Sequence, residues 1–193
     1  LFGGGNASAN GLTGNSGHNQ LNGGGGNDVL GGGAGNDTLN GGASADRVNG
    51  GSGIDTADYA GSAAVTIDLL AGLVSGGDAA GDVFVSIENI SGSDFADTLT
   101  GSDAADIFES FEGREGSDRI DGRGGIDRAD YYGSKGGVTV NLTTGTAGDG
   151  YGGTDTLLNI ENVRGSRDFN DSLIGNTANN KLDGLGGNDT LDG

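Results

Sequence analysis

The chain has 193 residues, and 45 of them are glycine, so nearly one position in four carries no side chain and a single large apolar core is excluded. The 28 acidic and 9 basic residues give a formal net charge of -19, which disfavours binding to nucleic acid and to anionic membrane surfaces. There is no cysteine and one histidine, which excludes disulfides, thiolate metal sites and histidine zinc sites and leaves hard cations as the expected partners.

A nine-residue repeat begins near the N-terminus and recurs in three blocks. Block 1, residues 5–58, contains six copies, and the last four follow one another in unbroken register as GGGGNDVLG, GGAGNDTLN, GGASADRVN and GGSGIDTAD. Block 2 covers residues 92–130 and block 3 covers residues 165–193, which brings the total to thirteen copies. The sixth position is Asp or Asn in every copy and the eighth is apolar in every copy, a regularity that composition alone does not produce.

Two inserts without the repeat, residues 59–91 and 131–164, separate the blocks. Each contains a run of alternating apolar and polar residues, VTIDL in the first and VTVNL in the second, which predicts a strand with one buried face. The segment GIDTADYAGSAAVTIDL recurs as GIDRADYYGSKGGVTVNL 72 residues later, so the chain contains a larger duplication. With Leu at position 1 and no methionine, residues 1–193 are expected to be one solenoid segment of a longer protein.

The repeat predicts an all-β fold, a right-handed parallel β-roll or β-helix solenoid with glycine-rich turns and two β-rich inserts. Six turn-forming positions followed by three extended ones make half of a coil, so two repeats close one turn of a narrow solenoid. Only the eighth-position side chain then points inward, which explains how a chain with few large apolar residues forms a core. No apolar run is long enough to cross a bilayer, and membrane insertion is not expected.

The turns of this solenoid have the chemistry of a calcium site. Glycine permits positive φ, and turns stacked about 4.8 Å apart would surround the sixth-position carboxylate with carbonyl oxygens. Ca²⁺ takes about six to eight oxygen ligands, whereas Mg²⁺ prefers a small octahedral cage. Residues eighteen apart lie on the same edge. The predicted pairs are Asp28 with Asp46, Asp37 with Asp55 and Asp171 with Asp189. If Ser110–Glu112 bulges out of the coil, Asp97 pairs with Asp118 and Asp106 pairs with Asp127.

Several calcium ions are expected, and the candidate ligands are the sixth-position residues and the turns before them. The carboxylate candidates are Asp28, Asp37, Asp46, Asp55, Asp97, Asp106, Asp118, Asp127, Asp171 and Asp189. The turn candidates are Gly24, Gly26, Gly33, Gly35, Gly42, Ser44, Gly51, Gly53, Gly116, Gly125 and Gly187. Weaker binding is expected at Asn10, Asn19 and Asn180, because an amide carries no charge.

The fragments GGGGNDVLG and GGAGNDTLN resemble the nonapeptide of the RTX, or haemolysin-type calcium-binding, family. The resemblance implies a β-roll that folds when calcium binds, export from a Gram-negative bacterium by type I secretion, and a position beside a separate catalytic or adhesive domain. The fourth position, usually glycine in the family, is another residue in six copies, namely Ser8, Ser44, Phe95, Ala104, Phe169 and Ala178. The best cluster of sites is therefore expected between Gly23 and Asp55.

The predicted function is a calcium-binding module of a secreted bacterial protein, which folds outside the cell and stabilises or presents attached domains. No catalytic motif or cysteine nucleophile is present, so the segment is not expected to be an enzyme. Two alternatives stay open, a self-assembling extracellular repeat of a surface layer, stalk or filament, and a calcium-dependent module for acidic polysaccharide that resembles alginate epimerase repeats. The second needs a basic stripe, and the candidates for it are Arg114, Arg119, Arg123, Arg128 and Lys135.

The inserts contribute further polar residues. Glu88 and Glu161 stand in matching IEN triplets and are expected to cap or hydrogen-bond a turn rather than to bind calcium. Tyr59 and Tyr131, which begin the two inserts, are expected to pack against the end of the coil. The candidates for an added metal site in the glycine-rich loops are Asp78, Asp82, Asp149 and Asp155.

Overall fold

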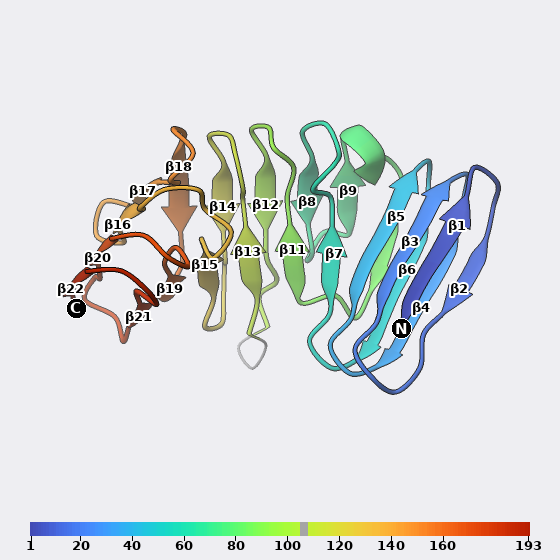
Figure 1. Ribbon diagram of the computed structural model, residues 1–193, viewed down its shortest axis with the longest axis horizontal. Helices are drawn as coiled ribbons and strands as arrows, with labels where there is room; N and C mark the ends of the chain where they lie inside the picture. Colours follow the sequence, from blue (N-terminus) through green and yellow to red (C-terminus); the bar gives the residue numbers. More distant parts are fainter. Residues whose placement is uncertain (105–107) are drawn as a thin grey trace. The chain divides into compact units, whose positions relative to one another are not determined.

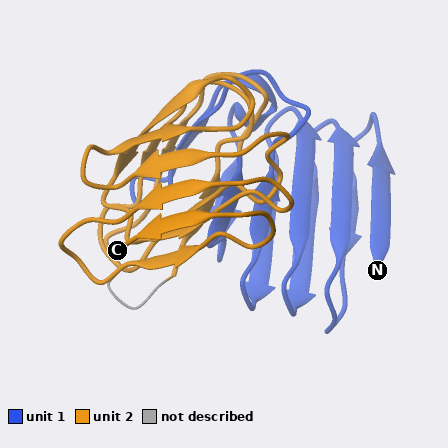
Figure 2. Cartoon of the chain, turned by 60° about the vertical axis from the view of Figure 1, so that its left-hand side comes forward, with its two compact units in different colours: residues 1–91 blue, residues 92–193 orange. Residues whose placement is uncertain are grey.

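The computed structural model describes residues 1–104 and 108–193, which form short strands joined by tight turns (Figure 1). The chain divides into two compact units, unit 1 from Leu1 to Ser91 and unit 2 from Gly92 to Gly193 (Figure 2). The strands of unit 1 are β1 (Phe2–Asn6), β2 (Gly11–Thr13), β3 (Gln20–Gly25), β4 (Val29–Ala34), β5 (Thr38–Ala43), β6 (Arg47–Ser52), β7 (Thr56–Asp58), β8 (Thr66–Asp68), β9 (Leu73–Ser75), β10 (Val83–Val85) and β11 (Asn89–Ser91). The strands of unit 2 are β12 (Thr98–Thr100), β13 (Ser110–Glu112), β14 (Arg119–Asp121), β15 (Arg128–Asp130), β16 (Thr139–Asn141), β17 (Thr146–Gly148), β18 (Thr154–Leu158), β19 (Asn162–Arg164), β20 (Ser172–Ile174), β21 (Lys181–Asp183) and β22 (Thr190–Asp192).

Unit 1 contains two parallel sheets, and successive repeats alternate between them. One sheet has the strand order β1-β3-β5-β7-β11, and the other has the order β10-β6-β4-β2 (Figure 1). Leu21 lies opposite Leu39 and Leu30 lies opposite Val48, a register of eighteen residues. Two repeats therefore make one turn of the coil, and the predicted parallel β-roll is confirmed. The first insert adds an antiparallel hairpin of β8 and β9.

Unit 2 follows the same plan with a longer excursion. Strands β13, β15, β19 and β21 form one parallel sheet. On the other side of the coil, β12, β14 and β18 pair in parallel, as do β16, β20 and β22. Strand β17 of the second insert lies antiparallel between β16 and β18 and joins the two groups.

The core of each unit is a narrow stack of eighth-position side chains. In most three-residue strands the middle side chain points into the core, because side chains alternate along a strand. Leu191 in the last strand, β22, is 49% exposed. The eighth-position residues with no exposed surface are Leu30, Leu99, Ile120, Ala129 and Leu173. Val29, at a seventh position, is 54% exposed. The pattern that predicts one inward side chain per half-coil is confirmed.

The repeat register predicted from the sequence is wrong at one place in block 2. The expected bulge at Ser110–Glu112 is strand β13, Phe111 is fully buried, and Ser110 lies opposite Arg128. With Phe111 in the core, inward side chains continue at nine-residue intervals through Ile120 to Ala129, so the extra residues precede the strand. Glu109 therefore takes the sixth position that the sequence assigns to Asp106, and Asp106 itself lies outside the described residues.

Each insert returns to the coil before its predicted end. In unit 1, β10 pairs with β6 and β11 pairs with β7, and in unit 2, β18 pairs with β14 and β19 pairs with β15. The matching sequences DVFVSIENI and DTLLNIENV thus make one further turn of each roll, with a shorter connection than the nonapeptide provides. Helix within the described ranges is limited to the 3-10 turn η1 (Gly77–Ala79), and no described helix has the length and apolar character needed to cross a membrane.

Replacing Leu39 by alanine is expected to lower the free energy of unfolding by about 2–5 kcal/mol, because its side chain is 1% exposed and the one-residue-wide core has little to refill the cavity. Urea unfolding in saturating calcium measures the loss. The matched control is Val29→Ala on β4, the preceding strand in the chain, where the side chain is 54% exposed. The free energy of unfolding of this variant is expected to change by no more than about 0.5 kcal/mol. Equal losses in the two variants would contradict the assigned core.

Candidate metal sites

A ladder of carboxylates joins successive turns of the coil. In seven of the described sixth-position aspartates, one carboxylate oxygen, Oδ1, accepts the backbone N–H of the sixth-position residue one turn earlier. The N···O distance is 2.7 Å from Asp28 to Asp46 and 2.8 Å from Asp37 to Asp55. The same bond joins Asn10 to Asp28, Asn19 to Asp37, Asp97 to Asp118, Glu109 to Asp127 and Asp171 to Asp189. Apart from Glu109, these are the neighbours that the spacing of the repeat predicts.

Acidic residues of the inserts extend the ladders, and sequence analysis does not place them there. Four of them accept an N–H from the last regular aspartate of a ladder, namely Asp82, Glu88, Asp155 and Glu161. The hydrogen-bonding role expected for Glu88 and Glu161 is therefore present in the structure. The signal that could have revealed all four is the duplication of DVFVSIENI as DTLLNIENV, in which each acid precedes an inward side chain by two places.

The second carboxylate oxygen, Oδ2, distinguishes two kinds of turn. In six turns, which we call open turns, this atom is buried and has no hydrogen-bond partner, and the carboxylates are those of Asp28, Asp37, Asp46, Asp55, Asp118 and Asp127. Each of these residues is at most 2% exposed, so bulk water does not supply the missing donor. A buried carboxylate oxygen without a donor is strongly unfavourable unless a cation pairs with it.

Backbone conformation produces the open turns. The fourth residue of each has positive φ, at Gly26 (85°), Gly35 (98°), Ser44 (95°), Gly53 (139°), Gly116 (131°) and Gly125 (130°). The second residue does as well, at Gly24 (98°), Gly33 (109°), Gly42 (87°) and Gly51 (108°) in unit 1 and at Arg114 (72°) and Arg123 (62°) in unit 2. Glycine adopts this conformation without strain, and Ser44 is the one open-turn residue at the fourth position that adopts it with a side chain.

Carbonyl oxygens face the unpartnered carboxylate oxygens. A Cβ atom on Gly23 would collide with both Asp28 Oδ2 and the carbonyl oxygen of Gly41 in the next turn. The equivalent position on Gly32 lies against Asp37 Oδ2 and the carbonyl oxygen of Gly50. The carboxylate oxygen and the carbonyl oxygen therefore face each other with no hydrogen-bond donor between them. Oxygen ligands of these two kinds are the ones that Ca²⁺ prefers. Across residues 1–104 and 108–193 no three acidic or histidine side chains form a metal-binding group, so backbone carbonyls must complete each site.

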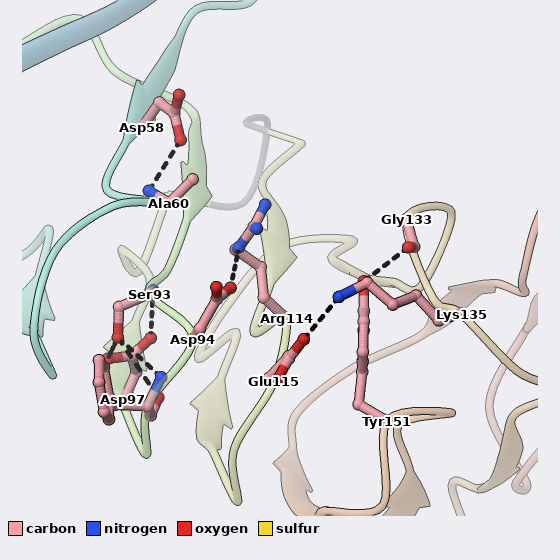
Figure 3. Close-up of polar contacts among 11 residues, drawn as sticks. Asp58, Ala60, Ser93, Asp94, Asp97, Arg114, Glu115, Gly133, Lys135 and Tyr151 are labelled. Atoms are coloured by element: carbon pink, nitrogen blue, oxygen red, sulfur yellow. Dashed lines mark hydrogen bonds and ion pairs between the residues drawn. The ribbon is translucent and has the colours of Figure 1, made fainter.

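Two aspartates lie in closed turns, in which a serine saturates the carboxylate. Ser93 donates its N–H to Asp97 Oδ2 at 2.6 Å and its hydroxyl to Oδ1 at 2.9 Å (Figure 3). Ser166 makes the same two bonds to Asp171, both at 2.7 Å. Both turns carry phenylalanine at the fourth position, and neither residue has positive φ. Both oxygens of Asp97 and of Asp171 therefore already have protein donors.

The asparagine turns are closed as well. The Oδ1 atom of Asn10 accepts the N–H of Asn6 at 2.7 Å, and that of Asn180 accepts the N–H of Asn176 at 2.7 Å. Asn19 accepts the N–H of Asn15 at 3.2 Å. At the last turn, Asp189 is partly exposed and follows Gly187, whose φ of 119° matches that of the open turns.

Burial raises the pKa of several open-turn carboxylates. Loss of solvent is the main cause, and it raises the pKa of Asp46 to about 6, that of Asp127 to about 7 and that of Asp118 to about 8. Neighbouring carboxylates raise these pKa values further, whereas the N–H bond from the adjacent turn lowers them. Without a cation, the pKa values of these three carboxyl groups therefore lie close to neutral pH.

A tyrosine hydroxyl donates a hydrogen bond to each of two carboxylates that the inserts contribute. The Tyr59 hydroxyl donates to Asp82 Oδ2 at 2.7 Å, and the Tyr131 hydroxyl donates to Asp155 Oδ2 at 3.0 Å. Both tyrosines are 3% exposed, so they fill the packing role that the sequence predicts and also satisfy a buried charge. Because the same pair occurs at the same place in both units, it is part of the duplicated design.

The predicted basic cluster does not form an unpaired stripe. Four of its five members make ion pairs within unit 2, Arg114 with Asp94 at 2.9 Å, Lys135 with Glu115 at 2.7 Å, Arg119 with Asp121 at 3.4 Å and Arg128 with Asp130 at 3.2 Å. Figure 3 shows the first two pairs side by side, next to Tyr151. The positive charge that an acidic polysaccharide would require is thus largely neutralised by neighbouring carboxylates.

In the calcium-free chain, lowering the pH from about 8 to about 4 is expected to increase β-structure. Because the pKa of Asp118 rises from 3.8 to about 8 on folding, the folded chain holds a proton that the unfolded chain has lost throughout this interval. Stability is therefore greatest at the acidic end and is lost as the pH rises toward 8. Circular dichroism in chelator measures the effect, and Asp118→Asn should flatten the upper part of the profile. A signal that grows with rising pH would contradict the raised pKa.

The family comparison agrees with this geometry. The model of the RTX calcium-binding nonapeptide repeat matches four stretches, residues 4–39, 30–57, 86–110 and 167–193, which together cover more than half of the chain. None of the curated proteins matches the chain. RTX repeats are structural calcium-binding units rather than catalytic ones, and they are typical of secreted bacterial proteins. The chain therefore belongs to the RTX family and is a calcium-binding module of a bacterial protein.

Proposed function

We propose that this chain is a calcium-dependent folding module of a secreted protein, which folds when Ca²⁺ binds outside the cell and stabilises or presents attached domains. The observation that supports the proposal is the set of six buried Oδ2 atoms that receive no hydrogen bond, two of which face the carbonyl oxygens of Gly41 and Gly50 across a glycine. A bound calcium ion would supply positive charge to the carboxylate and the carbonyls together. Protein donors already fill this role in the closed turns.

The open turns are the proposed calcium sites. Their ligands would be the Oδ2 atoms of Asp28, Asp37, Asp46, Asp55, Asp118 and Asp127, with carbonyl oxygens of the adjoining glycine-rich turns. Asp189 joins this set because the turn before it has the same backbone conformation at Gly187. The closed turns of Asp97 and Asp171 are proposed to stay free of calcium, since both of their carboxylate oxygens have donors.

Charge couples calcium binding to folding. The chain has a formal net charge of -19, and the coil stacks carboxylates on successive turns, so the folded state without cations carries strong self-repulsion. The narrow core of one side chain per half-coil offers little apolar burial to oppose it. The free energy of calcium binding at the open turns therefore contributes directly to the free energy of folding. Without calcium the chain is largely unfolded.

This coupling suits export. Extracellular calcium modules bind with dissociation constants of about 10⁻⁴ to 10⁻³ M, which the calcium-poor cytoplasm does not approach. The chain would stay unfolded inside the cell and fold after leaving it. Calcium outside the cell would then act as the signal that completes the module.

Titration of the metal-stripped chain with Ca²⁺ is expected to produce a cooperative transition from coil to β-structure, and Mg²⁺ at the same concentrations is expected to produce none, because the carbonyl-rich sites are too large and irregular for it. Far-ultraviolet circular dichroism follows the transition. β-structure that is indifferent to chelator would overturn the proposed function and would make the ladder a metal-free turn device.

Replacing Asp37 by asparagine is expected to remove at least one bound calcium ion and about 2–3 kcal/mol of stability at a calcium concentration of about 100 times the dissociation constant. The asparagine keeps the acceptor for the N–H of Asn19 and loses only the charge at Oδ2. Isothermal titration calorimetry counts the ions, and urea unfolding measures the stability.

The matched control for this variant is Asp97→Asn, in which the same substitution falls in a closed turn. The ion count of this variant is expected to equal that of the natural chain, because Ser93 already satisfies both carboxylate oxygens. Equal ion losses in the two variants would show that the distinction between open and closed turns does not determine where calcium binds.

A further inference from the structure

One buried carboxylate outside the repeat has the same unsatisfied oxygen as the open turns. Asp149 lies in the loop between β17 and β18 of unit 2 and has no exposed surface. Its Oδ1 atom accepts three backbone N–H groups, from Tyr151, Gly152 and Gly153, each at 2.9 Å. Its Oδ2 atom is buried and has no hydrogen-bond partner. The loop therefore holds the carboxylate in one orientation and leaves one oxygen without a donor.

A carbonyl oxygen of the repeat meets this second oxygen. A Cβ atom on Gly153 would collide with both Asp149 Oδ2 and the carbonyl oxygen of Gly116, so the two acceptors face each other across this glycine. Gly116 is the fourth residue of the open turn that ends at Asp118. The juxtaposition repeats the arrangement of Asp28 and the Gly41 carbonyl, but with a carboxylate that the nonapeptide does not provide.

The surroundings of Asp149 are strongly negative and well anchored. Its charge raises the pKa of both Asp118 and Asp155. The Tyr151 hydroxyl donates to the Gly133 carbonyl at 2.5 Å and holds the loop, with Lys135 over the aromatic ring (Figure 3). The Ser134 hydroxyl donates to the Asp149 carbonyl at 2.7 Å.

Unit 1 lacks this arrangement. Counted from the paired strands of the two hairpins, the position of Asp149 is occupied by Gly76 in unit 1. The nearest acidic residue of that loop is Asp78, which is half-buried and has no unpartnered buried oxygen among the described atoms. There, Ser62 accepts the N–H of Asp78 at 2.8 Å, whereas the matching Ser134 in unit 2 donates to a carbonyl. The two inserts start from the same duplicated sequence and keep the same spacing from VTIDL to Asp82 and from VTVNL to Asp155, but their loop sequences differ.

We propose that Asp149 and the Gly116 carbonyl form an additional site for a hard divalent cation, calcium, that lies outside the nonapeptide repeat and occurs in unit 2 alone. The ion would tie the insert loop to the roll by bridging a carboxylate of one to a carbonyl of the other. The proposal extends the proposed calcium-dependent function and rests on it. The competing explanation is a proton on Asp149 that is donated to the Gly116 carbonyl.

Asp149→Asn separates the two explanations. The asparagine keeps the Oδ1 acceptor for the three N–H groups and offers an amide donor to the Gly116 carbonyl, so it imitates the protonated acid and abolishes the cation site. Isothermal titration calorimetry with CaCl₂ should count one ion fewer per chain than in the natural chain. An unchanged ion count with equal or greater stability would overturn the proposal. The control is Asp78→Asn in unit 1, which should leave the ion count unchanged.

A second measurement covers a variant that is too unstable to titrate directly. The free energy of unfolding rises with the logarithm of calcium concentration by an amount set by the number of ions bound, so Asp149→Asn should reduce this slope by one ion. An unreduced slope would overturn the proposed site. Failure of the wider proposed function looks different, because the natural chain would then show no calcium dependence and Asp37→Asn would lose no ion.

Discussion

The roll depends on single carboxylates that each serve two neighbours. The Oδ1 atom of Asp46 accepts an N–H from Asp28 one turn away, and its Oδ2 atom lies buried without a donor. The first contact aligns the turns, but it also draws the second oxygen out of water. The stacking of the turns and the desolvation of the carboxylate thus follow from the same geometry, and every added open turn repeats both. The fold therefore creates the electrostatic problem that a divalent cation relieves.

The local backbone decides how each carboxylate is satisfied. Where the fourth residue has positive φ, as at Gly35, the turn presents carbonyls and leaves Oδ2 unpartnered. Where it is phenylalanine, as at Phe95, the turn folds back so that Ser93 provides two donors. The two kinds of aspartate turn thus differ both in the backbone conformation at the fourth position and in whether a serine donates to the carboxylate. The tyrosine hydroxyls at Asp82 and Asp155 provide a third means of satisfying the same type of group.

Much of this arrangement is predictable from sequence because the period is strict. Pairs such as Asp28 with Asp46 follow from counting eighteen residues, and the inward position of Leu39 follows from its place in the repeat. The counting fails where the period breaks. Two phenylalanines three residues apart, Phe108 and Phe111, compete for one core position, and the second occupies it because the following repeats are then in step.

Other features of the candidate sites depend on contacts that no spacing rule contains. Glu88 follows Asp82 by only six residues, so a nine-residue search does not detect that both belong to the ladder. The saturation of Asp97 by Ser93 depends on the path of four backbone residues. Ser44 is the opposite case, since a residue other than glycine suggests a disrupted turn, yet its φ of 95° preserves the open conformation. The sequence indicates where the carboxylates are, and the backbone conformation determines which of them have no hydrogen-bond donor at Oδ2.

The eighteen-residue register of unit 1 also has a kinetic consequence. Strand β5 needs only β3, one turn earlier in the chain, as its template, and each new turn of the nonapeptide block closes a loop of the same short length. The entropic cost of adding a turn is therefore small and nearly constant, and contacts between distant parts of the chain are not required. Such a roll grows by sequential addition, like a one-dimensional lattice, from whichever turn forms first.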